Sequence, residues 1–482
     1  MSDTIALRNI LLVLMLVLLI VGNICSEQIR VRTLKVAKVV PLPLVLWVVY
    51  LCLFPLWAPM QAVAWENLFG QWGESIIAWI VGFGAFIVLY NRGPSLISIG
   101  IASAFSLIVH LVLSALALMG FFSENFYQKR TLAGLVDEIY AWGHGGLTWM
   151  NFHNPLADGF NGVEVMHGNL GYASSLAIII FSSALFNAYK ENSQSSILTC
   201  IAAIVLCFLS LFIIRSRGAI IFGAIFLTIT LVLNYYRCKK NQLISNSWSE
   251  GKSNFVNLSL LVFLVFLVLG TVGYKSIKND YRWHSMKDKV VAGVQINDPF
   301  ETLCNGLSST DELGIRNSLK GESQEYVDDV IFGLRGQDGG RILLMRVGVD
   351  FVLENPFGFD GSRHSYKNLM IEKCGHIPSL TFAHTHQSWM DLSLAIGWVG
   401  VALFASIFIN FAIFSIKKFR DSKNIDLLVV LLITSIFWFT RGFFDSLFRE
   451  HYLEMQALVL AYIYIKLLNT RSNQTHADDL KM

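Results

Sequence analysis

Long apolar runs restrict what this chain can fold into more than any other feature of its sequence. A helix that crosses a bilayer needs about 20 mostly apolar residues, and about eleven runs of this kind lie between Ile10 and Leu468. Charged residues make up only 15% of the chain, against about 25% in soluble domains. The sequence therefore predicts an all-α integral membrane protein with about 11–12 transmembrane helices. The expected spans cover residues 10–24, 39–57, 76–90, 96–122, 170–188, 197–214, 218–236, 255–274, 390–416, 427–444 and 453–468.

Basic residues in the short loops predict which side of the membrane each loop faces, because Lys and Arg are retained in the cytoplasm. Three basic clusters, within residues 30–38, 237–252 and 417–423, share one side if the spans alternate, and we assign that side to the cytoplasm. The first apolar run is not followed by a small-residue cleavage site, so we expect it to be retained. The N-terminus then lies outside, unless a span has been missed or merged.

These assignments divide the chain into four parts. Residues 1–274 hold the N-terminal transmembrane helices, with an outer loop near 123–169. Residues 275–389 form a large periplasmic loop, which is polar and too long, at about 115 residues, for a simple connection, so we expect a partly helical subdomain. Residues 390–470 hold the C-terminal transmembrane helices, and residues 471–482 form a cytoplasmic tail.

The seven cysteines show neither a CxxC pair nor a Cys/His spacing typical of zinc sites. We therefore expect no metal site and no cofactor. Cys304 and Cys374 are the two cysteines in the large loop, where an oxidising periplasm would allow them to pair. They are a candidate disulfide, and the sequence leaves the pairing open.

Two arginines, Arg215 and Arg217, interrupt nearly continuous apolar sequence. On the outer side of the membrane they run against the positive-inside rule, so we expect an anionic partner. A diphosphate fits, because a guanidinium donates two parallel hydrogen bonds to its oxygens. The alternative is a tight turn with basic residues at the interface.

A third arginine, Arg341, stands near the start of a predicted helix whose apolar residues extend to Val352. Asn355, Pro356 and a glycine-rich turn end this helix. A cation near a helix N-terminus does not favour the helix dipole, which suggests a ligand for Arg341. A solvated surface arginine is the alternative.

Two histidines, His384 and His386, precede the ninth span, within Ala383-His384-Thr385-His386-Gln387. Imidazole can act as a base near neutral pH. The alternatives are interfacial hydrogen bonding and a metal pair, and the second lacks a third ligand. We interpret the other histidines as structural; they include His144, His153, His167, His364 and His376.

Four charged residues gather at the outer end of the tenth span: Arg441, Asp445, Arg449 and Glu450. Neutralising ion pairs at the interface explain them adequately. Arg441 and Asp445 are kept as supporting candidates for the site.

Three of these segments, taken together, resemble motifs of the O-antigen ligase and polymerase superfamily. They are Ser216-Arg217-Gly218, the run from Gly340-Arg341 to Asn355-Pro356-Phe357-Gly358-Phe359-Asp360-Gly361, and His384-Thr385-His386-Gln387. The glycines of Gly-Trp-Val-Gly at 397–400 match a further feature, and the resemblance covers about 170–404. Two positions depart from the family pattern: Gln387 stands where Asn is usual and Met345 where Trp is common.

The resemblance implies a metal-independent, inverting glycosyltransferase of the multi-spanning GT-C type in the bacterial inner membrane, with its active site facing the periplasm. Its partners would be an undecaprenyl-diphosphate-linked glycan as donor, the lipid A-core oligosaccharide as acceptor and membrane lipids, with no nucleic acid. Arg217 and Arg341, with Arg215, would bind the diphosphate. His386 would deprotonate the acceptor hydroxyl, with His384 and Gln387 in support.

The acceptor is the open choice. A ligase transfers to lipid A-core and a polymerase to another carrier-linked repeat unit; the long loop and the motif order favour the ligase. A protein O-oligosaccharyltransferase would share the mechanism. A flippase for a lipid-linked sugar belongs to a different class, but transporters bury their charges near the midplane between repeated halves, and this chain shows no repeat. If the ligase hypothesis holds, Arg217, Arg341 and His386 should line one periplasm-facing cavity.

Overall fold

The computed structural model describes most of the chain. The described residues are 2–89, 93–105, 167–214, 217–244, 270–271, 284–335, 338–380, 384–419, 425–446 and 450–479. Within these ranges the regular elements are helices and no strand forms. Several of the helices are long and apolar. The protein is therefore an all-α membrane protein.

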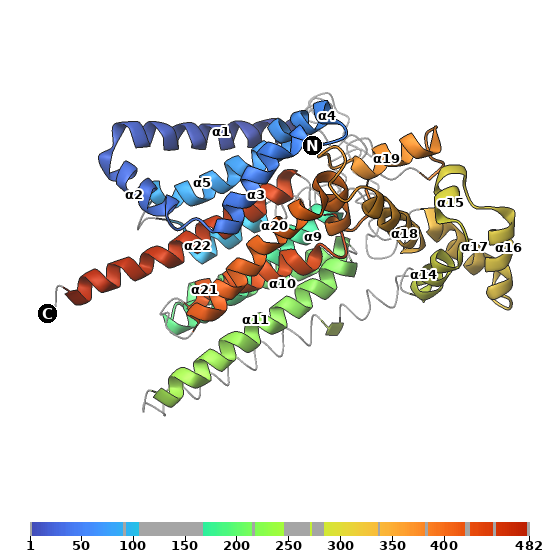
Figure 1. Ribbon diagram of the computed structural model, residues 1–482. Helices are drawn as coiled ribbons and strands as arrows, with labels where there is room; N and C mark the ends of the chain where they lie inside the picture. Colours follow the sequence, from blue (N-terminus) through green and yellow to red (C-terminus); the bar gives the residue numbers. More distant parts are fainter. Residues whose placement is uncertain are drawn as a thin grey trace, which may run out of the picture.

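A bundle of long helices makes up the membrane part (Figure 1). Its helices are α1 (Ser2–Cys25), α2 (Glu27–Ala37), α3 (Leu42–Leu53), α5 (Gly73–Leu89), α9 (His167–Lys190), α10 (Gln194–Ile214), α11 (Arg217–Ile244), α20 (Ser388–Lys418), α21 (Ile425–Arg441) and α22 (Glu450–Asp479), with the short η1 (Phe54–Leu56), α4 (Gln61–Asn67) and η2 (Leu68–Trp72) before α5.

A smaller set of short helices, which we name the loop subdomain, gathers at one end of the bundle (Figure 1). It comprises α14 (Met286–Gln295), α15 (Pro299–Asn305), α16 (Ser309–Ser318), α17 (Gln324–Phe332), η5 (Gly333–Arg335), α18 (Asp338–Glu354) and α19 (Ser365–Cys374). These helices come from the segment in which the sequence predicts a partly helical subdomain.

Helices that are long and apolar enough to span a membrane are fewer than the eleven expected runs. Among the described residues three pass by length and composition, and a pair bent by 115° between α1 and α2 is a fourth candidate. The three are Gln61–Leu89, Gln194–Leu211 and Ser388–Lys418. The expected spans 96–122 and 255–274 lie largely outside the described residues. The total therefore stays a prediction.

The described parts of the three basic clusters, residues 30–38, 237–244 and 417–419, lie at the end of the bundle opposite the loop subdomain (Figure 1). Arg32 of α2 donates to the Ile87 carbonyl, near the last turn of α5, at 3.4 Å. Lys417 and Lys418 stand in the last turn of α20, and residues 237–240 lie near the end of α11. The clusters that the sequence predicts on one side of the membrane thus occupy one end of the bundle.

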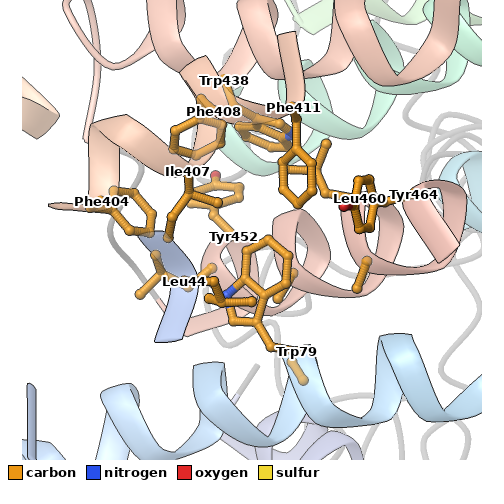
Figure 2. Packing of buried hydrophobic residues seen from close by; sticks show 14 of the residues in the cluster. Leu44, Trp79, Phe404, Ile407, Phe408, Phe411, Trp438, Tyr452, Leu460 and Tyr464 are labelled. Carbon is orange, nitrogen blue, oxygen red and sulfur yellow. The ribbon is translucent and has the colours of Figure 1, made fainter. Parts of the chain in front are cut away.

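Aromatic side chains from distant spans fill the bundle core (Figure 2). Phe411 of α20 packs between Trp79 of α5 and Tyr464 of α22, with ring centroids 6.1 and 5.1 Å away. Gly82 lets α5 approach α22 closely, since a Cβ there would lie 2.8 Å from the Ala461 Cβ. Small residues at such crossings are the usual way for membrane helices to gain packing contacts.

Helix α20 is broken inside the membrane part at Gly397, whose φ is +75°. A break frees backbone groups that need partners where water is scarce. Residues 355–361, which we name the glycine turn, supply most of them. Amides of the turn donate to the carbonyls of Leu394 and Ala395, at 2.8 and 3.0 Å.

Two further backbone groups at the break are also paired. The Tyr50 hydroxyl donates to the Ile396 carbonyl at 2.6 Å, and the Trp398 amide donates to the Pro356 carbonyl at 2.9 Å. Gly358 and Gly397 allow this contact, since a Cβ on Gly358 would lie 2.6 Å from the Gly397 nitrogen. The Gly-Trp-Val-Gly segment and the glycine turn are therefore two halves of one backbone joint.

A buried carboxylate, Asp360, fixes the residues that follow the glycine turn. It accepts the Ser362 amide at 2.9 Å, the Asn368 side-chain amide at 2.7 Å and the Ser365 hydroxyl. The carbonyl of Gly361 accepts the Trp72 indole N–H at 2.8 Å. The start of α19 is thereby held against η2 from the N-terminal part of the chain.

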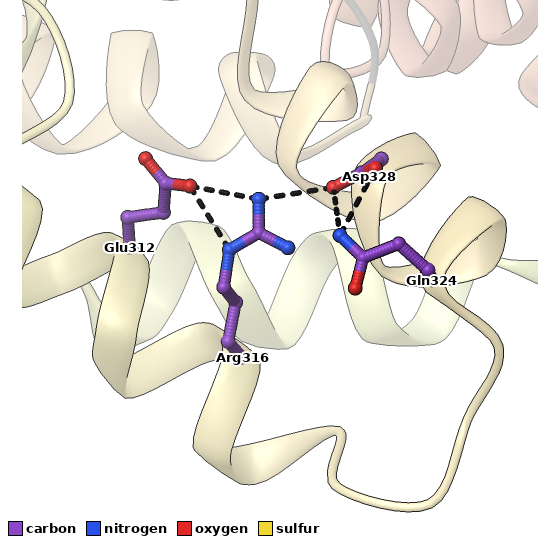
Figure 3. Close-up of polar contacts among 4 residues, drawn as sticks. All are labelled: Glu312, Arg316, Gln324 and Asp328. Carbon is purple, nitrogen blue, oxygen red and sulfur yellow. Dashed lines mark hydrogen bonds and ion pairs between the residues drawn. The ribbon is translucent and has the colours of Figure 1, made fainter.

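Two of the salt-bridge sites in the loop subdomain differ in how deeply their charges are buried. Arg316 of α16 lies 2.8 Å from Glu312 and 3.0 Å from Asp328 of α17, and these hydrogen bonds raise its pKa (Figure 3). Lys289 of α14 is fully buried and lies 2.9 Å from Asp329. The exposed Arg316 pair contributes little. The buried Lys289 pair is the one whose loss would leave a charge without its partner in the interior.

A disulfide joins Cys304 of α15 to Cys374 of α19, with Cα atoms 5.7 Å apart. Beside it the Ser379 amide donates to the Cys304 carbonyl at 2.8 Å and the Leu380 amide to the Leu303 carbonyl at 3.1 Å. The sequence left this pairing open. The structure shows that it secures the segment that leads toward His384.

We expect Cys304→Ser to lower the stability of the loop subdomain by about 2 to 4 kcal/mol, because the crosslink restricts the unfolded chain. The measurement is thermal unfolding of the purified protein, with protease cleavage within residues 284–380 as the signal that the loop subdomain has unfolded. Cys25→Ser is the matched control, since Cys25 is an exposed free cysteine. Equal unfolding temperatures for Cys304→Ser and Cys25→Ser would contradict the expectation.

Candidate active site

The two predicted histidines lie in a short connection, residues 384–387, which we name the histidine loop. It joins the loop subdomain to α20. The rings of His384 and His386 are in edge contact, with centroids 4.4 Å apart. Gln387 caps α20, because its side-chain carbonyl accepts the Met390 amide. Gln387 thus uses its amide group as a helix cap, a role that Asn fills equally well.

The backbone of the histidine loop is unusual at His386, whose φ is +60°. A left-handed conformation is unfavourable for a residue with a Cβ and persists where the surroundings impose it. The neighbouring Thr385 supplies that restraint: its buried side chain and its amide are both hydrogen-bonded to Asp391.

Asp391 is a site residue that the sequence analysis missed. One carboxylate oxygen accepts the Thr385 amide at 2.8 Å and the Thr385 hydroxyl at 2.7 Å, and the other accepts the Ser446 hydroxyl at 2.8 Å. The available signal was a carboxylate within an otherwise apolar span, where ionisable groups usually serve a function.

A cavity of about 200 Å³ opens beside the histidine loop. It is formed by the N-terminal part of the chain, the residues after the glycine turn, the histidine loop, α20 and the residues before α22. Its lining residues are Gln71, Trp72, Ser362, Arg363, His364, His384, Asp391, Leu392, Ala395 and Ser446. The cavity therefore combines cationic and imidazole groups with one carboxylate.

Arg363 and His364 are further cavity residues that the sequence did not indicate. The sequence pattern does not indicate Arg363, and it predicts a structural role for His364. The Arg363 Nε donates to the His364 Nε2 at 2.9 Å, and both side chains line the cavity. Their position directly after the glycine turn was the only local signal. Nearby, burial and then the charge of Asp391 raise the pKa of the Tyr366 hydroxyl.

Arg441 and Asp445 lie where α21 ends, next to the histidine loop. Arg441 is 3% exposed, lies 3.3 Å from Asp445 and stacks over the Phe222 ring. The Ser388 amide, just after the histidine loop, donates to the Gly442 and Asp445 carbonyls at 2.8 and 3.1 Å. Arg441 and Asp445 therefore support the loop from the α21 side.

The Ser-Arg-Gly segment ends at Gly218, which contacts the Arg441 side chain. A Cβ on Gly218 would lie 2.6 Å from Nη1 of Arg441, so the start of α11 packs directly against that guanidinium. Arg217 is the first residue of α11. Its side chain, with Arg215 and Ser216, lies outside the described part of the structure. The start of α11 at Gly218 is thus close to Arg441, which lies beside the histidine loop.

Arg341 is exposed on α18. Two helical turns later, about 10 Å along the axis, Gly348 packs on the histidine loop: a Cβ there would lie 3.1 Å from the Thr385 Cγ2. Residues seven apart share a helix face, so Arg341 lies on the face of α18 that meets the loop. The cavity lining includes His384 but neither Arg341 nor His386. A cavity common to Arg217, Arg341 and His386 stays a prediction.

Comparison with known proteins gives one family. Comparison with curated proteins gives no match. Residues 179–405 match the family model described as O-Antigen ligase, and this range holds Arg217, Arg341, the glycine turn, the histidine loop and the break in α20. The match covers just under half of the chain, and it supports the O-antigen ligase and polymerase superfamily of membrane glycosyl-transfer enzymes.

Proposed function

We propose that this protein is an O-antigen ligase, which transfers a glycan from undecaprenyl diphosphate to the lipid A-core oligosaccharide. The observation that carries the proposal is the histidine loop beside a cavity, within the range that matches the O-antigen ligase family. The cavity lining holds the imidazoles of His364 and His384 and the Arg363 guanidinium. These groups suit a hydroxyl that must lose a proton and a substrate that carries negative charge.

The proposed location is the bacterial inner membrane, with the site facing the periplasm. The histidine loop lies at the bundle end that carries the loop subdomain, and the basic clusters lie at the other (Figure 1). Basic residues at helix ends are retained in the cytoplasm. The opposite end of the bundle, which carries the histidine loop, would then face the periplasm. A disulfide in the loop subdomain agrees with an oxidising compartment.

The proposed reaction is an inverting displacement. His386, with His384 in contact, takes the proton from the acceptor hydroxyl. The acceptor oxygen then attacks the anomeric carbon as the bond from that carbon to the diphosphate oxygen breaks. Arg217 and Arg341, with Arg215, stabilise the charge that collects on the leaving diphosphate. The proposal needs no divalent metal, because the guanidinium groups supply the positive charge.

A transfer assay tests the proposal and separates it from its alternatives. Purified protein in detergent with EDTA receives an undecaprenyl-diphosphate glycan donor together with lipid A-core. Product on lipid A-core supports the ligase. Longer carrier-linked chains identify a polymerase instead. Binding of the donor without transfer to either acceptor overturns the enzyme proposal and favours a flippase.

Arg341→Ala is expected to lower kcat/KM for the donor by about 10- to 100-fold, the effect of one charge-assisted hydrogen bond. Arg341→Lys should recover only part of this loss, because an ammonium lacks the planar fork of donors. Arg335→Ala, an exposed arginine of the same subdomain, is the matched control. If Arg341→Ala and Arg335→Ala give the same kinetics, Arg341 does not bind the diphosphate.

A further inference from the structure

We infer that Asp391 is the positioning residue of the histidine loop: it fixes the two imidazoles through Thr385 and ties them to the α21–α22 connection through Ser446. This inference rests on the proposed glycan transfer and assigns a role within it. In this role Asp391 accepts hydrogen bonds and takes no proton from the substrate.

The hydrogen bonds of Asp391 show which groups it holds. Three donors share its two oxygens: the Thr385 amide, the Thr385 hydroxyl and the Ser446 hydroxyl, all at 2.7–2.8 Å. Asp391 is 9% exposed as a residue, at the edge of the cavity that it lines. A buried carboxylate that accepts three hydrogen bonds is a fixed acceptor in the native structure.

Thr385 transmits this restraint to both histidines because it stands between them. Its hydroxyl also accepts the Gln387 amide at 3.2 Å, so the residues on either side of His386 are held. This bonding maintains the left-handed backbone of His386, and the close contact between the two rings follows from it.

Ser446 connects the loop to the other half of the site. It directly follows Asp445, whose carbonyl accepts the Ser388 amide at 3.1 Å, and whose carboxylate lies 3.3 Å from Arg441. Arg441 in turn contacts the start of α11 at Gly218. Asp391 therefore sets the distance between the imidazoles and the segment that carries Arg217.

Asp391→Ala should lower kcat by about 100-fold, the effect of a misplacement of about 1 Å in a reacting group, while KM for the donor stays within about twofold. Asp391→Asn should recover at least about tenfold of that loss, because an amide oxygen still accepts both Thr385 donors. Thr385→Val should lower kcat by about tenfold, the effect of one lost buried hydrogen bond, and Thr385→Ser should restore most of it.

Asp298→Ala is the control for general destabilisation, since it removes the N-cap of α15 away from the loop. It should lower the unfolding temperature and leave kcat of the folded protein unchanged. Asp391→Asn and Thr385→Val keep the test decisive if Asp391→Ala does not fold. The positioning role of Asp391 would be overturned if kcat of Asp391→Asn were as low as that of Asp391→Ala. It would also be overturned if Asp391→Ala and Thr385→Val left kcat unchanged.

His386→Ala in the same assay separates this inference from the function on which it rests. Full transfer by His386→Ala and by His384→Ala would remove the proposed mechanism itself. Loss of transfer in the histidine variants, with wild-type kcat in the folded Asp391 and Thr385 variants, would remove only the role of Asp391.

Discussion

His386→Ala is expected to lower kcat for glycan transfer by about 100- to 10,000-fold, the usual contribution of a positioned general base. An acceptor hydroxyl is a weak nucleophile until its proton is removed as the new bond forms. The donor contacts proposed for Arg217 and Arg341 remain, so KM for the donor should change little. The measurement is initial rate against donor concentration, at saturating acceptor, for folded protein of each variant.

His376→Ala is the matched control for this substitution. His376 is an exposed histidine between α19 and the histidine loop. Its replacement should leave kcat unchanged. His384→Ala tests the neighbouring imidazole, which lines the cavity and touches the His386 ring. We expect the smaller loss for His384→Ala; a larger loss there than in His386→Ala would transfer the role of base to His384.

Gly397→Ala is expected to destabilise the folded protein by about 3 to 5 kcal/mol, the range reached when a strained backbone position acquires a clashing side chain. A Cβ at Gly397 would lie 2.4 Å from the Phe357 carbonyl carbon. The atoms that the added Cβ would meet belong to the backbone of Phe357 and Gly358, so no side chain can rotate away to relieve the clash. The φ of +75° with ψ of 175° is also a region that only glycine enters readily.

The joint between α20 and the glycine turn should separate in this variant. The carbonyls of Leu394 and Ala395 would then lose their donors in a region that offers little water. The expected readouts are a lowered unfolding temperature and faster proteolysis near residues 355–361. Gly314→Ala is the control, because that helical glycine has nothing within 4 Å of the added Cβ. Equal stability of the Gly397→Ala and Gly314→Ala variants would contradict the predicted clash.

Local pattern was enough to predict several elements. The apolar spacing and Asn-Pro signal placed a helix before Asn355, and α18 ends at Glu354. The expected span 390–416 corresponds to α20, which covers Ser388–Lys418. The motif order indicated the superfamily that the match of residues 179–405 supports. The two helix predictions depend on neighbouring residues alone, through helical periodicity, whereas the superfamily depends on the order of motifs along the chain.

The sequence by itself therefore determined the membrane class and several helical segments, and it indicated the superfamily that the match of residues 179–405 supports. Only the tertiary structure decided that α20 breaks at Gly397, that Asp391 holds the histidine loop, and that Trp72 bonds Gly361 across 289 residues of sequence. The physical reason is that a broken helix and a buried carboxylate are stable only when donors from remote segments satisfy them. Hydrophobic periodicity carries no information about those distant partners.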